Sequence, residues 1–351
     1  MLCALPHMDM SILSFAREAR THRIGGHCSS MPYESLSMTP FFPLRWRSAG
    51  QLFAAIALIF SLSSVGFPAH ANNSALTAAS VEFARDWVVT PQAAFDLIKQ
   101  GALVIDARAS DLKRKNGEIK GAVSLVWQDL SEPNLPTKGR PLPVDQASKK
   151  LQALGVTKDR AIVVVADAVN GWGEDGRITW LLRNWGHGRV VLADGGLAAL
   201  EKLGSLTIKP AAAAGDFVAK ESSLEIKKEE VKAKLDNKDV VFLDVREPRE
   251  FDGKTPYGES RGGHLAPAKH LFFKDLLDKE GRLLTRAEIE KLLASKGVTR
   301  DKEVVSYCTG GIRAGWVTAV LNDMGYKARN YAGSMWEWSA QSAAEFPLQK
   351  N

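Results

Sequence analysis

The strongest constraint on the fold is an internal duplication. The segment "GALVIDARASD", residues 101–111, corresponds to "KDVVFLDVREPRE", residues 238–250, because each is an apolar run that ends in Asp-x-Arg. A longer segment, residues 161–196, corresponds in the same way to residues 303–338. The order and spacing of these pairs agree along the chain, so we infer two copies of one structural unit.

Within each copy, short apolar runs alternate with helical patterns such as "TPQAAFDLIKQG" and "TRAEIEKLLASKG". Buried strands separated by amphipathic helices predict a parallel sheet with helices on both faces, an α/β fold. Residues 204–223 show neither the strand period nor the helix period and are predicted to be a linker. We therefore place one domain at residues 84–203 and the other at residues 224–347.

The composition is that of a globular protein with two domains. The chain has 351 residues, of which 45% are hydrophobic and 25% charged, enough for two cores. Its net charge of +6 is spread along the chain without a basic block, so no nucleic-acid partner is expected and small anions are favoured. No His or Cys cluster has metal-ligand spacing, and we expect neither a metal nor an organic cofactor.

The N-terminal region has the order of a secretory signal peptide. Two arginines precede an apolar segment, residues 52–67, which is followed by Ala69-His70-Ala71. We expect residues 1–71 to be removed, so that a periplasmic or secreted chain begins near Asn72 with no stable membrane insertion. The alternative is an uncleaved membrane anchor, although the apolar segment is shorter than the ~20 residues of a membrane span.

The translation start and the cleavage site together determine which cysteines the mature chain keeps. The region before the two arginines is unusual for a signal peptide, and we expect translation to start at Met31 or Met38. Cleavage removes Cys3 and Cys28 in any case and leaves Cys308 as the single cysteine. In an oxidising compartment, such a cysteine is buried and inert, pairs between chains, or is reactive.

Cys308 is predicted to lie between a strand and a helix. It follows the apolar run "EVVSY", residues 303–307, and precedes a helical pattern in residues 313–326. Thr309, Gly310, Gly311 and Ile312 form the connection. A glycine-rich turn at a helix start directs N–H groups toward an anion, and such a turn stabilises a thiolate.

Arg313 follows this connection and offers a planar fork that suits the oxyanion of a substrate. The alternative interpretation is a buried, inert cysteine beside a surface arginine. We favour the reactive cysteine because the strand, the two glycines and the arginine occur together.

These segments resemble the tandem-domain rhodaneses, the thiosulfate and 3-mercaptopyruvate sulfurtransferases. The resemblance rests on the Cys-x-x-Gly-x-Arg loop and on "FLDVREPREF", "GGHLAPA" and "YAGSMWEW", and it spans the expected mature chain. It implies a catalytic C-terminal domain and a silent N-terminal copy. It also implies that Cys308 forms a persulfide with sulfur from thiosulfate or a related donor, and passes that sulfur to cyanide or a thiol.

The resemblance also suggests roles for nearby residues. Arg313 and the Thr309–Ile312 connection are expected to bind the donor, with Arg249 as a further substrate-binding candidate. Tandem rhodaneses often carry an arginine where this chain has Glu250, which leaves the donor open. Asp244 and Arg246 are expected to support the loop structurally, because the silent copy repeats Asp-x-Arg. His264 is expected to be a structural turn residue, with a role as a base as the alternative.

The first domain differs from the second at the corresponding loop. Aligning "VVVAD" with "VVSYC" places Asp167 at the position of Cys308. The loop that follows is longer and contains Glu174 and Asp175, so we expect this domain to be a scaffold. Trp172 is a candidate for one wall of the pocket.

Two rival functions remain open. A cysteine phosphatase or arsenate reductase uses a similar anion cradle, but its loop has one more residue between cysteine and arginine than the four found here. An exported persulfide carrier would use Cys308 without efficient turnover. Turnover of thiosulfate with cyanide as acceptor separates an enzyme from a carrier.

The signal-peptide interpretation predicts the mass of the mature protein. In a periplasmic or secreted fraction, the chain should begin near Asn72, because the small-x-small site ends at Ala71. Intact-mass analysis of that fraction measures this directly. A cytoplasmic chain that retains residues 39–71 would contradict the interpretation.

Overall fold

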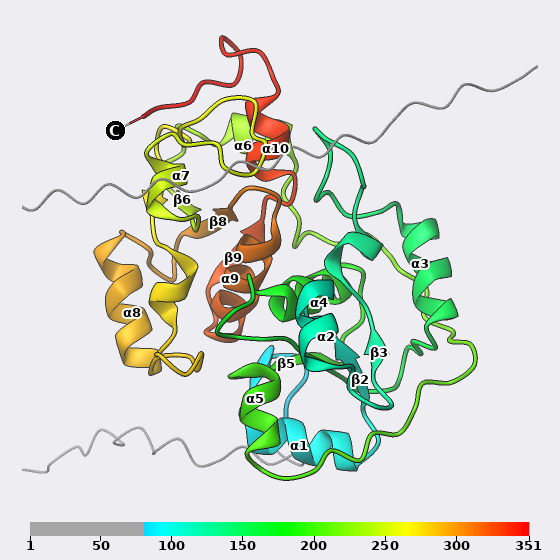
Figure 1. Cartoon of the computed structure of the whole chain (residues 1–351). Helices are drawn as coiled ribbons and strands as arrows, with labels where there is room; N and C mark the ends of the chain where they lie inside the picture. The colour runs from blue at the N-terminus through cyan, green and yellow to red at the C-terminus, as the bar shows by residue number, and fades with distance from the viewer. Residues whose placement is uncertain (1–80, 351) are drawn as a thin grey trace, which may run out of the picture. The chain divides into compact units, whose positions relative to one another are not determined.

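The structure, a computed structural model, describes residues 81–350, and the expected signal peptide lies outside this range. Two parallel sheets form two α/β domains, with strand orders β1-β5-β4-β2-β3 and β7-β6-β8-β9 (Figure 1). This confirms the predicted fold class.

In chain order, the elements of the first domain are β1 (Val88–Val89), α1 (Pro91–Lys99), β2 (Leu103–Asp106), α2 (Ser110–Asn116), β3 (Val123–Ser124), the 3-10 helix η2 (Trp127–Leu130), α3 (Val144–Ala153), β4 (Ile162–Val165), α4 (Glu174–Asn184), β5 (Val190–Ala193) and α5 (Gly196–Glu201). Those of the second domain are α6 (Lys228–Ala233), β6 (Val240–Asp244), α7 (Pro248–Phe251), β7 (Lys269–His270), the 3-10 helix η3 (Phe273–Leu276), α8 (Arg286–Ser295), β8 (Glu303–Tyr307), α9 (Ile312–Asp323), β9 (Lys327–Asn330) and α10 (Ser334–Ser339). Residues 204–223 contain neither helix nor strand.

The central strands are buried on both faces, which explains their continuous apolar sequences. All four residues of β4, Ile-Val-Val-Val, are buried. Alternate residues pack into different clusters: Val163 and Val165 pack with α1 and α5, whereas Ile162 and Val164 pack with α3 and α4. In the second domain, α6 and α10 cover one face and α8 and α9 the other.

One hydrophobic cluster runs from the α3/α4 layer of the first domain into the α8/α9 layer of the second. At its centre, α4 packs against α9, and Figure 1 shows the two helices side by side. A Cβ atom on Gly176 would lie 2.5 Å from the Trp316 Cα, and one on Gly315 would lie 3.2 Å from the Arg177 Cα. The two glycines stand at equivalent positions of the duplication, so each copy supplies one glycine to the close crossing.

The strand register corrects one expected equivalence. Asp106 of β2 pairs with Val165, whereas the corresponding Asp244 of β6 pairs with Tyr307. The residue after Val165 is Ala166, and it therefore takes the place of Cys308. Consistent with this, the Ala166 carbonyl accepts a hydrogen bond from the start of α5, as the Cys308 carbonyl does from α10. The alignment that placed Asp167 opposite Cys308 is wrong by one residue.

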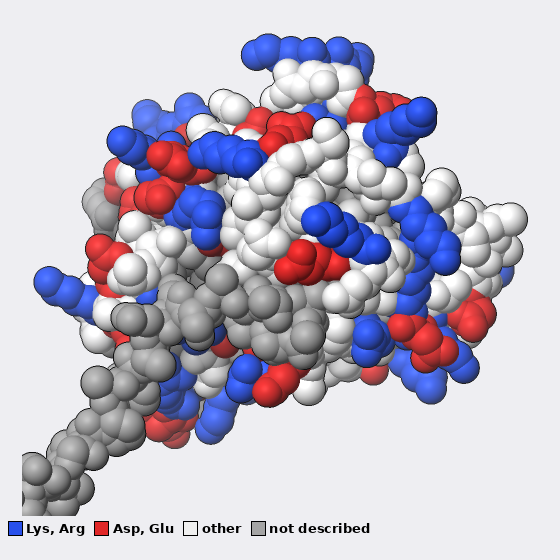
Figure 2. All heavy atoms as spheres, turned by 90° about the horizontal axis from the view of Figure 1, so that it is seen from below, with Lys and Arg blue, Asp and Glu red and all other residues white. Residues whose placement is uncertain are grey.

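The surface carries charges of both signs. On the face in Figure 2, basic and acidic side chains are interspersed over the described residues. Within residues 81–350, the helices are all too short or too polar to cross a bilayer.

The helix crossing gives a stability prediction. Gly176→Ala should lower the free energy of unfolding by roughly 1 to 3 kcal/mol, since the new methyl group collides with the α9 backbone. Helix propensity alone would predict a gain in stability, because alanine is favoured over glycine in a helix. Urea denaturation measures the change, and Gly188→Ala is the matched control because nothing lies within 4 Å of its Cβ position. Equal stability of the two variants would contradict the tight crossing.

Candidate active site

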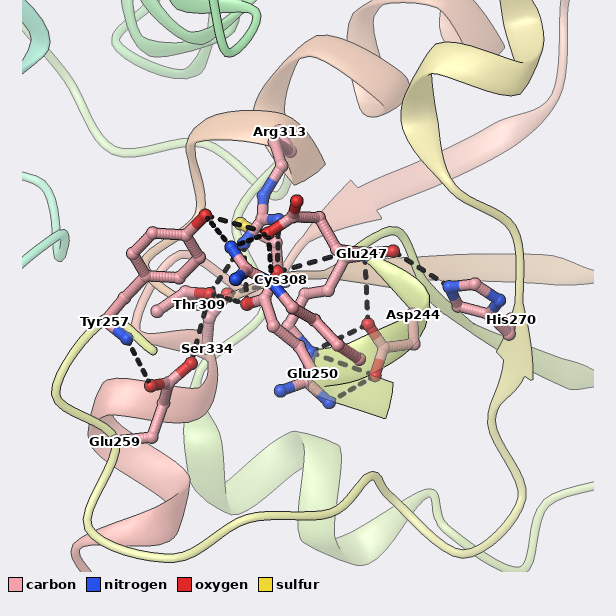
Figure 3. A network of polar contacts seen from close by, with 12 residues as sticks. Asp244, Glu247, Glu250, Tyr257, Glu259, His270, Cys308, Thr309, Arg313 and Ser334 are labelled. Atoms are coloured by element: carbon pink, nitrogen blue, oxygen red, sulfur yellow. Dashed lines mark hydrogen bonds and ion pairs between the residues drawn. The ribbon is translucent and has the colours of Figure 1, made fainter. Parts of the chain in front are cut away.

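Cys308 lies directly after β8, at the C-terminal edge of the second sheet, as predicted. Its side chain is buried, and its Sγ accepts a hydrogen bond from the Gly311 N–H at 3.1 Å. Its own N–H donates to the Ser334 Oγ at 3.1 Å, which joins the loop to the start of α10 (Figure 3). The backbone of Cys308 is therefore fixed to the start of α10, and its thiol faces a backbone donor.

The two glycines of the loop are needed for different reasons. Gly311 precedes α9 with φ of +79°, a left-handed conformation that disfavours other residues. Gly310 has ordinary φ, but a Cβ atom there would lie 2.1 Å from the Trp336 ring. The predicted turn thus directs at least the Gly311 N–H toward the sulfur and brings an indole ring against the loop.

The position of Arg313 differs from the expected one. Its Nη1 donates to Glu250 Oε2 at 2.6 Å, and its Nη2 donates to Glu250 Oε1 at 2.9 Å. Nη2 also donates to the Thr309 hydroxyl at 2.6 Å, and that hydroxyl donates to Glu250. The fork that we expected to be free for an oxyanion is occupied by Glu250, and this pairing offsets part of the cost of burying the guanidinium. The glutamate that replaces the family's usual arginine was the sequence signal for this pair.

The pair between Arg313 and Glu250 remains ionised at neutral pH. Burial raises the pKa of Glu250, but the hydrogen bonds and charge of Arg313 outweigh it and hold that pKa below its ordinary value. Burial lowers the pKa of Arg313, and the Glu250 hydrogen bond together with the Cys308 charge more than reverses this effect. The pair as a whole therefore adds no net charge to the pocket.

A cavity of about 170 Å³ opens above the cysteine. Its walls are largely aromatic and come from both domains: Trp127, Trp172 and Glu174 from the first, and Tyr257, Cys308, Thr309, Gly310, Ile312, Arg313 and Trp336 from the second. Trp172 was predicted as a wall residue, and it also covers the Arg313 guanidinium at 5.4 Å. Trp127, Tyr257 and Trp336 were not predicted as wall residues, although "YAGSMWEW" contains the last of these.

Arg249 does not line this cavity. Its side chain is half exposed and bonds to Glu247 at 2.9 Å and to the Tyr257 hydroxyl at 3.1 Å. The same Glu247 oxygen accepts the Tyr257 hydroxyl at 2.8 Å (Figure 3). Arg249 therefore contributes to the cavity only through its hydrogen bond to Tyr257. Its side chain does not line the space in which a sulfur donor would bind.

Asp244 and Arg246 form a fully buried ion pair of 2.6 Å. The Arg246 Nη2 also donates to the Gly263 carbonyl at 2.7 Å, which ties the end of β6 to the turn that follows. The first domain repeats this arrangement with Asp106 and Arg108, where no cysteine is present. The same tie between strand and turn is therefore present with and without a cysteine, as expected of a pair with a structural role.

His264 is also a structural residue in this geometry. Its Nδ1 lies 2.9 Å from the Phe251 carbonyl, and its ring stacks on that of Phe251 with centroids 3.7 Å apart. Within the described part of the chain, no three His, Cys, Asp or Glu side chains are grouped to hold a metal ion.

The Glu250 pair predicts a specific dependence of stability on pH. Folding lowers the pKa of Glu250, so its stabilising effect is present above the ordinary glutamate pKa of about 4.3 and is lost as the pH falls through the lower folded-state value. Glu250→Gln should cost about 3 to 5 kcal/mol at pH 7. This difference from the unsubstituted protein should shrink below about pH 4.

Urea denaturation across that pH range provides the measurement. Glu290→Gln is the control, because it breaks an exposed ion pair with Arg300 and should change stability by less than about 1 kcal/mol. A cost for Glu250→Gln that does not change between pH 7 and acid would show that the carboxylate charge is not what stabilises the loop.

Comparisons with known proteins agree with this geometry. The family model of the rhodanese-like domain matches residues 90–203 and 227–341. The thiosulfate sulfurtransferase of Azotobacter vinelandii is 30% identical, over 67% of this chain and 88% of its own length. That of Corynebacterium glutamicum is 29% identical, over 68% of this chain and 82% of its own length.

A solved structure with the same fold is that of SseA from Escherichia coli, described as a 3-mercaptopyruvate sulfotransferase. It aligns with a TM-score of 0.60 and 25% identity, over 71% of this chain and 98% of its own. The two family matches coincide with the two sheets, and the second contains the Cys308 loop. The chain therefore belongs to the rhodanese family and is a tandem-domain sulfurtransferase.

Proposed function

We propose that the protein moves a sulfane sulfur from a small-molecule donor, thiosulfate or a related compound, to a thiol or cyanide through a persulfide on Cys308. The observation that carries this proposal is the contact between the Cys308 Sγ and the Gly311 N–H at the base of an open cavity. The names of the sequence relatives support thiosulfate as the donor class.

The transfer takes two displacement steps. The Cys308 thiolate attacks the outer sulfur of the donor, the donor's S–S bond breaks, and sulfite leaves with the bonding electron pair. An acceptor thiolate or cyanide then attacks the terminal sulfur of the persulfide and restores the Cys308 thiolate. In the free thiolate the Cys308 Sγ carries the negative charge, and the Gly311 N–H is already directed at it, without reorganisation. In the persulfide the negative charge lies on the terminal sulfur.

The pocket limits how a donor is held. Of the residues that line it, Arg313 is the basic one, and Glu250 neutralises it. A dianionic donor must therefore bind to the N–H groups at the start of α9 or displace Glu250, because burying an unpaired anion is costly. The aromatic walls favour a donor or acceptor with an apolar body over a fully hydrated anion. Comparing thiosulfate with 3-mercaptopyruvate in steady state tests this preference.

We also propose that the chain is exported. The order of charged, apolar and small residues between positions 45 and 71 supports this. Export would place Cys308 in an oxidising compartment. Burial of the thiol then limits its loss to unwanted oxidation.

The proposed mechanism predicts that Cys308→Ser abolishes sulfur transfer, since a hydroxyl cannot accept the sulfane sulfur. After treatment with thiosulfate, mass spectrometry should find one added sulfur on the Cys308 peptide of the unsubstituted protein. Turnover with cyanide should accompany it, whereas a carrier would form the persulfide without repeated cycles.

The matched control places a thiol at the equivalent position of the first domain. Cys308→Ser combined with Ala166→Cys should remain inactive, because the longer loop there follows a different path to α4. Activity in Cys308→Ser alone would rule out the persulfide route. Recovered activity in the double variant would show that position along the strand, and not the loop, is sufficient.

A further inference from the structure

Arg177 is a fully buried cation of the silent domain that reaches the catalytic loop. It lies in α4, and its Nη1 donates to the Gly311 carbonyl at 3.2 Å. Its Nη2 donates to the Ser131 hydroxyl at 3.1 Å and to the Gly139 carbonyl. Its Nε has no hydrogen-bond partner within residues 81–350, and no ion pair of that range includes this guanidinium.

Among the buried arginines of the described residues, Arg177 and Arg183 bind no carboxylate directly, and of these two Arg177 is the one that contacts the Cys308 loop. Arg108, Arg246 and Arg313 are equally buried, and each binds an aspartate or glutamate directly. Burial lowers the pKa of Arg177 to about 10, with the charges of Glu225 and Cys308 acting in the opposite direction. Arg177 is therefore still a cation at neutral pH, held at a desolvation cost that no bonded anion offsets.

The duplication shows that this cation is specific to one side of the interface. Arg177 directly follows Gly176 in α4, as Trp316 directly follows Gly315 in α9. Each of these side chains crosses to the glycine that precedes the other domain's helix. Trp316 packs on Gly173, at the end of the first domain's loop before α4, whereas Arg177 donates to the carbonyl of Gly311, at the end of the Cys308 loop before α9. The loop without a cysteine is therefore contacted by the indole ring of Trp316, and the loop with Cys308 is contacted by the cation of Arg177.

Gly311 connects this cation to the sulfur. Its N–H donates to the Cys308 Sγ at 3.1 Å, while its carbonyl accepts from Arg177 at 3.2 Å and from the Asn330 Nδ2 at 3.1 Å. We propose that Arg177 is a positioning residue of the silent domain that fixes the Gly311 peptide toward Cys308 and stabilises the thiolate and persulfide with its unpaired charge. This inference rests on the proposed role of Cys308 as the nucleophile.

Other charges near the sulfur do not replace this contribution. The Arg313 charge is cancelled by Glu250, and burial raises the pKa of Glu225, a carboxylate of the second domain whose charge interacts with that of Arg177. Arg140 is paired with Glu337 of α10. The other titratable residues that line the cavity or bond to Thr309 are acidic or phenolic and do not favour a thiolate: Glu174, Tyr257 and Glu259. Two lysines, Lys138 and Lys274, lie over the Trp336 and Trp172 rings but do not line the cavity themselves.

The test measures the reactivity of Cys308 with iodoacetamide, a neutral reagent, as a function of pH in the purified protein. Arg177→Met should move the midpoint of this profile upward by about one pH unit, because the thiolate loses a nearby cation. Sulfur transfer at neutral pH should fall as a consequence, by at most about tenfold, because a one-unit change in midpoint alters the thiolate fraction by no more than that factor. Arg177→Lys keeps the charge and should stay within a few tenths of a unit of the unsubstituted midpoint.

Arg183→Met is the matched control. Arg183 lies on the same helix, is similarly buried, and binds the backbone carbonyls of Phe83, Asp86 and Val190 away from the cysteine. Its removal should leave the midpoint unchanged. If Arg177→Met does not fold, Arg177→Gln serves, since it keeps a donor to Gly311 without the charge.

Two results would overturn the proposal. The first is an unshifted midpoint in the uncharged variant, whatever its activity. The second is an equal shift in Arg183→Met, which would reflect general loosening of the fold. Because alkylation needs no sulfur donor, the result is independent of whether thiosulfate is the true substrate.

Discussion

The close crossing of α4 and α9 is the contact on which the site depends. Gly176 and Gly315 have no side chain, so each lets a residue of the other helix pack directly against its backbone. The hydrophobic cluster around these two glycines contains residues of both domains. This packing brings Trp127, Trp172 and Arg177 of the first domain to the loop of the second. A cysteine loop on an isolated second domain would keep its Gly311 donor but lose one wall of its cavity and the cation beneath it.

The two halves have diverged where they face each other. In the first, Ala166 replaces the cysteine, and Asp167 accepts N–H groups from Val169 and Asn170 of its own long loop. Asp175 is fully buried near the start of α4, the helix that follows this loop, and burial raises its pKa to about 7. A loop with a buried carboxyl group at its helix start is poorly suited to hold a thiolate, which agrees with the silent role predicted for this domain.

Features encoded by local sequence were predictable, and contacts across long separations were not. The duplication, the strand before Cys308 and the repeated Asp-x-Arg pair follow from short motifs, and the structure confirms them. The partner of Arg313 lies 63 residues away, and Arg177 lies 134 residues from Gly311, so neither contact leaves a pattern within one element. The one-residue error at Asp167 arose because an apolar run does not reveal its own register, which strand pairing fixes.

The charges of the site explain why a tandem arrangement suits this chemistry. In the second domain the arginine that lines the cavity is paired with Glu250, so the pair orders the loop without leaving net positive charge. An anionic sulfur in a largely aromatic cavity must then rely on the Gly311 N–H and on a cation with no anion bonded to it. Arg177 meets that need from behind the loop, where it cannot obstruct the donor. The duplicated half has no cysteine of its own at this position, and its contribution to the site is this charge and one wall of the cavity.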